Sequence, residues 1–105
     1  MTDISELRIY GLMIKSFGDK ETEKIFHQEF SKKIPPDIQS RALIKLLILE
    51  NAEREEDLKS PPTNRFEHLK GNLRGYCSVR INDHWRITFN FSEGNCFDVS
   101  ITDYH

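Results

Sequence analysis

Apolar residues change their spacing between the two halves of this chain, and that change sets the class of fold. Between residues 19 and 49 they recur every three or four residues, which is the period of a helix. From residue 76 they recur at every second position, which is the period of a strand, in three segments: 76–81, 85–91 and 97–102. Strands with one apolar face are typical of an antiparallel sheet that packs one side on helices. We therefore expect an α+β fold.

Two helices are expected before this sheet. The first opens at Gly18-Asp19, with Asp19 as a plausible N-cap, and its inward stripe runs through Thr22, Phe26, Phe30 and Lys33. Pro35-Pro36-Asp37 ends this helix and starts the second, because proline fits the first turn of a helix but not its interior. Ile14-Lys15-Ser16-Phe17 is typical of a short strand, which we expect to be added to the sheet.

The second helix has an unusually wide apolar face. Its main stripe is Ile38, Ala42, Leu46 and Leu49, and the residues that widen it are Leu43, Ile44, Leu47 and Ile48. Such width indicates either a deeply packed helix or a surface for a partner, of which the first is commoner.

Size and composition limit the classes of protein to consider. The 105 residues suffice for one domain and not for two, and no apolar run approaches the roughly 20 residues that span a bilayer. Two cysteines cannot build a disulfide framework, and the start lacks a secretory signal, so we expect a cytoplasmic protein. The net charge is -2, but residues 65–91 hold five basic residues against two acidic ones. This stretch could serve nucleic-acid binding or be ordinary scatter of surface charge.

The alternation of faces also predicts which residues stand opposite one another in the sheet. A three-residue turn, Asn82-Asp83-His84, places Ile81 opposite Trp85 and Arg80 opposite Arg86, whereas a two-residue turn would put Arg86 in the core. Pairing Phe91 with Phe97 in the next hairpin sets Arg86 opposite Thr102 and His84 opposite Tyr104. The same parity turns Cys77 inward and Cys96 outward, so we expect no bond between them.

This register gathers a polar cluster on one face of the sheet: Arg80, His84, Arg86, Thr102 and Tyr104, with His105 just beyond. Two arginines directly opposed across strands repel each other. Either an anion such as phosphate bridges them, or Asp98, Asp103 or Glu67 neutralises the pair. We favour the phosphate site.

Several motifs of the chain resemble those of a known family. The motifs are the runs 16–23, Ile34-Pro35-Pro36-Asp37-Ile38-Gln39, Pro61-Pro62-Thr63-Asn64-Arg65, 66–75, 78–87 and the terminal Thr102-Asp103-Tyr104-His105. Together they resemble the HigB branch of the RelE-like toxins. The likeness covers residues 13–105 and leaves residues 1–12 as an N-terminal extension. Either Met13 is the native start or the extension contacts a partner, and the sequence leaves both alternatives open.

The resemblance implies a fold and an activity. It implies a small RelE-like α+β domain that cleaves messenger RNA in the ribosomal A site, without a metal or other cofactor. The ribose 2′-OH would attack the adjacent phosphate, leaving a 2′,3′-cyclic phosphate and a 5′-hydroxyl. The implied partner is a HigA-like antitoxin with a helix-turn-helix domain, and operator DNA would be bound only through that antitoxin.

The resemblance also assigns the catalytic residues by position. Lys70 matches the lysine of the Leu-Lys-Gly motif, Arg86 the arginine of Trp-Arg-Ile, and Tyr104 and His105 the terminal pair. Fixed cations can bind a phosphorane more tightly than the diester, and a histidine exchanges protons near neutral pH. We expect the substrate to be bound by other residues of the same region: Arg65, Glu67, His68, Arg74, Arg80 and His84.

Some alternatives remain open at this point. Glu67 stands where some members have histidine, so either Glu67 or His105 could be the general base, with His105 slightly favoured. Tyr104 could hydrogen-bond phosphate or stack on a base. A different class of function is a non-catalytic module that acts as corepressor with its antitoxin. A metal enzyme is disfavoured, because no residues have the spacing of known metal ligands.

Overall fold

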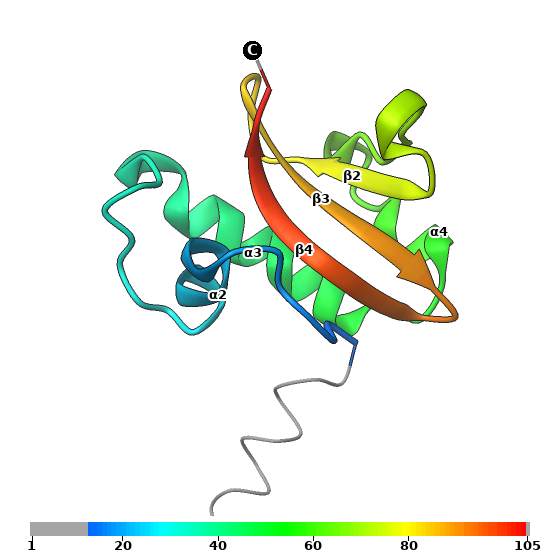
Figure 1. The fold of residues 1–105 in the computed structure, drawn as a ribbon, viewed down its shortest axis with the longest axis horizontal. Coiled ribbons are helices and arrows are strands. Elements are labelled where there is room, and N and C mark those ends of the chain that lie inside the picture. Colours follow the sequence, from blue (N-terminus) through cyan, green and yellow to red (C-terminus); the bar gives the residue numbers. More distant parts are fainter. Residues whose placement is uncertain (1–12, 105) are drawn as a thin grey trace, which may run out of the picture.

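The computed structural model describes residues 13–104 as a curved antiparallel sheet packed on helices (Figure 1). The helices are α2 (Lys20–Phe26), α3 (Pro36–Asn51) and α4 (Glu55–Leu58), with 3-10 turns η1 (Pro62–Asn64) and η2 (Gly71–Leu73). The strands are β1 (Glu67–His68), β2 (Tyr76–Arg80), β3 (Trp85–Ser92) and β4 (Asn95–Asp103), in the order β1-β2-β3-β4. The α+β class predicted from the sequence is confirmed. None of the described helices has the length and apolar character needed to cross a membrane.

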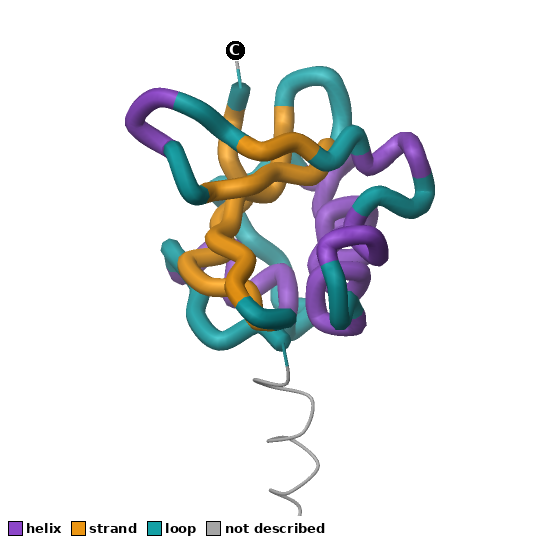
Figure 2. Tube along the Cα trace, turned by 90° about the vertical axis from the view of Figure 1, so that its right-hand side faces the viewer, coloured by secondary structure: helices purple, strands orange, loops and turns teal. Residues whose placement is uncertain are grey.

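The core lies between the apolar face of the sheet and α3. Figure 2 shows the strands and the helices as two layers beside one another. Its fully buried side chains come from both layers, among them Ala42, Leu46, Leu49, Val79, Ile87 and Phe89. The start of α3 agrees with the sequence, since Pro36 occupies its first turn. The wide face of α3 is not deeply packed throughout, however. Ile44 is 57% exposed and Leu47 43% exposed, and a partner for this face stays a prediction.

The first helix is shorter than predicted. Asp19 caps α2 by accepting a hydrogen bond from the Thr22 amide at 2.7 Å, as expected. The helix nevertheless ends at Phe26, because Gln28 adopts a left-handed conformation with φ of 65°. The predicted continuation through Phe30 and Lys33 is therefore wrong, and Phe30 is 63% exposed.

The N-terminal segment lies along β4 without forming a continuous strand. Only two isolated parallel bridges join them, Ile14 to Cys96 and Phe17 to Val99. A bulge in β4 separates these bridges, so an unbroken ladder cannot form. The buried Glu50 carboxylate also holds this segment to α3, by accepting from the Ile14 amide at 3.0 Å.

The bulge changes part of the predicted register. Arg80 stands opposite Arg86, and Arg86 opposite Thr102, as predicted. Nearer the tip of the hairpin the prediction is wrong, because Phe91 pairs with Cys96 and not with Phe97. The extra residue is Asp98, which has φ of 57°. Because of this insertion, the side chains of the preceding residues of β4 point to the opposite face of the sheet from the one predicted.

The reversal exchanges the places predicted for two side chains. Cys96 is completely buried where it was expected to face outward, and Phe97 is 38% exposed where it was expected in the core. Cys77 is buried as predicted, and both thiols are free.

Candidate active site

Arg86 is the central residue of the polar face of the sheet. It is only 8% exposed, and it lies in the middle of the sheet on β3. Its Nε donates to Ser78 Oγ at 2.8 Å, and one Nη2 hydrogen goes to the Arg65 carbonyl at 2.6 Å. A guanidinium has five N–H donors, so Arg86 is held in place while donors remain for a ligand.

Two elements that the sequence pattern did not reveal build the surroundings of Arg86. The short strand β1 pairs Glu67 with Ser78 and so brings Glu67 Oε1 to 3.9 Å from Arg86 Nη2. The 3-10 turn η1 delivers Arg65 in a left-handed conformation, with φ of 46°, which presents its carbonyl to the guanidinium. Arg65 thus contributes its backbone to Arg86, whereas its side chain is exposed.

Sequence reasoning missed Ser78 as a member of this site. It is fully buried and holds Arg86 through its hydroxyl. The signal was present, because Ser78 lies two residues before Arg80 and so shares its face of β2.

Tyr104 approaches Arg86 from the end of the chain. Its amide donates to the His84 carbonyl at 2.5 Å, in agreement with the predicted pairing of these residues. The Arg86 guanidinium carbon then lies 5.9 Å from the centre of the Tyr104 ring, within the range of a cation–π contact. Figure 1 shows the end of β4 beside the turn between β2 and β3. Arg86 and Tyr104 therefore face one another.

The two opposed arginines have separate partners. Arg80 forms an ion pair and hydrogen bond with Asp83 in the adjoining turn. Arg86 has Glu67 at ion-pair distance, and its hydrogen bonds go to neutral oxygens. Of the three acids considered for neutralisation, Glu67 lies at ion-pair distance from Arg86, and the Asp98 carboxylate accepts from the Tyr76 hydroxyl at 2.6 Å.

Three of the remaining predicted site residues lie on β1 and at the ends of η2. Lys70 and Arg74 are exposed at the two ends of η2, and within residues 13–104 neither side chain has a recorded hydrogen bond or ion pair. His68 lies on the opposite face of β1 from Glu67, where its Nε2 is 3.1 Å from Glu55 and its Nδ1 is 3.6 Å from Cys77 Sγ. The predicted role of His105 falls outside the described residues.

Neither cysteine has the character of a nucleophile. Burial raises the pKa of the Cys77 thiol to about 11 and that of the Cys96 thiol to about 12. Both thiols therefore stay protonated at neutral pH, and the chemistry of the site falls to the polar face.

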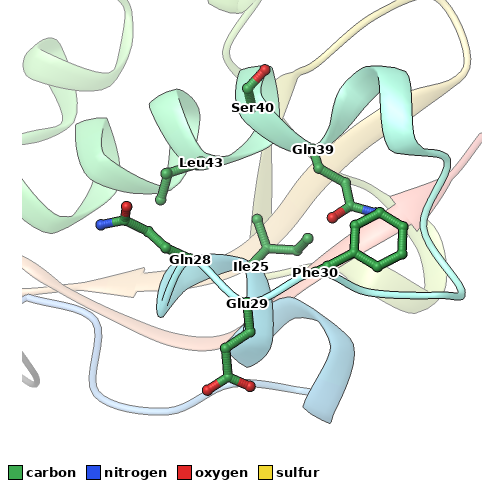
Figure 3. A pocket seen from close by; sticks show the side chains of 7 residues that line it. All are labelled: Ile25, Gln28, Glu29, Phe30, Gln39, Ser40 and Leu43. Carbon is green, nitrogen blue, oxygen red and sulfur yellow. The ribbon is translucent and has the colours of Figure 1, made fainter.

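A separate hollow lies between α2 and α3, on the helical side of the molecule (Figure 3). Its volume is about 270 Å³, and no basic residue lines it: the lining is Ile25, Gln28, Glu29, Phe30, Gln39, Ser40 and Leu43. A hollow with one carboxylate and no cation is not suited to phosphate, so we do not place the active site there.

Comparisons with known proteins show the family of the chain. The model of the family described as "RelE-like toxin of type II toxin-antitoxin system HigB" matches residues 15–105. The Toxin HigB-1 of Vibrio cholerae serotype O1 is 42% identical over 83 residues, which cover 78% of this chain and 87% of that protein. The Endoribonuclease HigB of Proteus vulgaris is 30% identical over 93 residues, which cover 89% of this chain and 100% of that protein. The chain belongs to the HigB family of RelE-like toxins of type II toxin-antitoxin systems.

Proposed function

We propose that this chain is a metal-independent endoribonuclease that cleaves messenger RNA in the ribosomal A site and so stops translation. The observation that carries the proposal is the buried Arg86, fixed by Ser78 and the Arg65 carbonyl, with Glu67 and Tyr104 beside it. The name of its relative from Proteus vulgaris, an endoribonuclease, supports the same activity.

The proposed reaction is transfer of the phosphoryl group within the RNA chain. A general base removes the proton of the 2′-OH, whose oxygen attacks the adjacent phosphorus. The bond from phosphorus to the 5′ oxygen breaks, and that oxygen receives a proton from a general acid. The products are a 2′,3′-cyclic phosphate and a 5′-hydroxyl, so no water enters this step.

Arg86 and Lys70 serve to stabilise the phosphorane. That intermediate carries more negative charge than the diester, so a cation held in place beforehand lowers the barrier without reorganising during the reaction. Arg86 fits this role because two of its hydrogen bonds are already made to the protein. Arg65, Arg74, Arg80 and His84 surround this centre and contact the substrate.

The general base is either Glu67 or His105. Glu67 has the advantage of position, since its carboxylate lies 3.9 Å from Arg86 and its side chain is 58% exposed to an incoming ribose. Glu67→Gln and deletion of His105 separate the two, because the loss of the base removes the rising acidic limb of the pH–rate profile. The variant that retains that limb identifies the residue that is not the base.

The proposed partners follow from the family. The chain is held inactive in the cytoplasm by a HigA-like antitoxin with a helix-turn-helix domain, and it reaches operator DNA only through that antitoxin. Substrate positioning comes largely from the ribosome, because a protein with a net charge of -2 has few phosphate contacts of its own.

Primer extension on a translated message, with and without ribosomes, tests the activity. We expect wild-type protein to produce new ends only when the message is being translated, and those ends to carry a 5′-hydroxyl. An absence of cleavage, together with tighter operator binding by the antitoxin in its presence, would instead establish a non-catalytic corepressor.

A further inference from the structure

A basic hollow lies at the edge of the sheet, next to the candidate active site. It has a volume of about 360 Å³ and is formed where α3, η1 and the end of β2 meet. Its charged lining residues are Arg41, Lys45 and Arg80, and the others are Ile44, Thr63 and Ile81. Among residues 13–104, no acidic residue is part of this lining.

Lys45 is the most unusual of these cations because it is buried. It is 8% exposed, and its Nζ donates at 2.5 Å to the Oδ1 of Asn64. No carboxylate of residues 13–104 lies within ion-pair distance of it, although an ammonium group has three N–H donors. Burial and the charges of Arg41 and Arg80 lower the pKa of Lys45. A buried cation without a counter-ion is costly, and a bound anion would relieve that cost.

The surroundings fix Lys45 in this position. Asn64 is fully buried, and its Nδ2 donates to the carbonyls of Leu58 and Ser60, so that its Oδ1 is turned to Lys45. Arg41 makes one long hydrogen bond, at 3.4 Å, to the Ile81 carbonyl, and Arg80 pairs with Asp83. Both guanidiniums retain further N–H groups that could donate hydrogen bonds to an anion.

The place of the hollow in the sheet indicates which anion it binds. Arg80 lies on β2 and lines the hollow. It stands directly opposite Arg86 of the candidate active site, which lies on the neighbouring strand β3. A polyanion bound at Arg86 can therefore continue across Arg80 to the edge of the sheet. We propose that the hollow formed by Arg41, Lys45 and Arg80 binds a backbone phosphate of RNA other than the phosphate being cleaved. This proposal deepens the proposed function, and the phosphate can come from the message or from ribosomal RNA.

Binding of RNA that cannot be cleaved tests the hollow independently of catalysis. The probes are a fully 2′-O-methylated oligonucleotide, followed by fluorescence anisotropy at several salt concentrations, and intact ribosomes, followed by co-sedimentation. We compare wild type with Arg41→Gln and Lys45→Met. If Lys45→Met does not fold, the comparison depends on Arg41→Gln alone. Lys24→Gln, an exposed cation of α2 far along the chain from the hollow, is the matched control.

We expect each hollow variant to weaken binding about 3- to 10-fold and to reduce the salt dependence by about 0.7 in log–log slope, the value for one lost phosphate contact on single-stranded nucleic acid. Arg41→Lys should restore binding, because it restores the charge, and Lys24→Gln should match wild type. A loss with the oligonucleotide places the phosphate in the message, and a loss with ribosomes alone places it in ribosomal RNA. Wild-type binding of both probes by Arg41→Gln would overturn the proposal. A wild type that does not cleave, with variants that still lose binding, would contradict the proposed activity and leave the phosphate site standing.

Discussion

Arg86 shows how a single residue can be fixed by its neighbours and still be available for chemistry. Its hydrogen bonds go to a hydroxyl and a carbonyl, which hold the guanidinium without cancelling its charge. The one carboxylate nearby, Glu67, stays at 3.9 Å, beyond hydrogen-bond distance. A cation placed in this way interacts more strongly with a developing phosphorane than a mobile surface lysine would.

Asn64 provides the first stability prediction at the residue scale. Asn64→Ala leaves the carbonyls of Leu58 and Ser60 without their donor and removes the acceptor of Lys45, so we expect the free energy of unfolding to fall by about 2 to 4 kcal/mol. Urea denaturation measures this. Asn51→Ala is the matched control, because Asn51 is exposed and bonds only a carbonyl of its own helix. Equal losses for the two variants would contradict the role given to Asn64.

The Cys96 thiol supplies a prediction of pH dependence. The thiol ionises near pH 9 when unfolded but has a pKa of about 12 in the fold, so above pH 9 the unfolded state binds fewer protons. Its contribution to stability is therefore complete below pH 9 and is lost as the pH rises, at up to about 1.4 kcal/mol per pH unit. Cys96→Ala should lower stability at pH 7.5 yet flatten its decline between pH 9 and 10.5 in urea titrations. Identical slopes for variant and wild type would refute this.

At the scale of elements, the long periodic segments could be predicted and the short ones could not. Helix α3 and strands β2 to β4 each bury a repeating face, and that repeat is visible in the sequence. The four residues of α4 and the two of β1 contain too little repeat to be recognised. This is why the sequence predicted Arg86 and Tyr104 as neighbours but gave no geometry for Glu67.

The hairpin between β3 and β4 shows a different reason for failure. The predicted register depends on strict alternation, whereas β4 contains an extra residue at Asp98, and the hairpin turns through Glu93 and Gly94, both with positive φ. A two-residue turn of this kind favours glycine at its second position, so the Glu-Gly pair was a usable signal. The tight turn shifts the register of the two strands by one residue, and the bulge shifts it back by one. The predicted pairing of Arg86 with Thr102 is therefore correct.

The cap of α2 gives a prediction at the same scale. Asp19→Ala removes the acceptor of the Thr22 amide, so we expect a loss of about 1 kcal/mol in unfolding free energy. Asp19→Asn retains a capping oxygen and should lie close to wild type. Both values come from urea denaturation, and an equal loss for alanine and asparagine would show that the capping hydrogen bond is not what stabilises the helix.

For the molecule as a whole, the fold separates stability from activity. The apolar face of the sheet and α3 form the core, while the opposite face carries Arg86 and Arg80. Arg80 also lines the hollow at the edge of the sheet that includes Lys45 of α3. A protein with a net charge of -2 thus concentrates positive charge along one path. Such a path would suit a single RNA strand, and its hollow also includes Ile44, one of the exposed apolar residues of α3.

Cleavage of a translated message by Arg86→Lys tests the central claim most directly. Lysine keeps the charge but cannot reproduce the bonds to Ser78 and the Arg65 carbonyl together, so the cation is no longer held in place. Arg54→Lys, the same change at an exposed position beside α4, is the control, and thermal unfolding verifies that both variants fold. We predict that Arg86→Lys cleaves about 100-fold more slowly or worse, as after loss of one fixed donor to an oxyanion, while Arg54→Lys cleaves like wild type. A folded Arg86→Lys protein that cleaves at the wild-type rate would contradict the account.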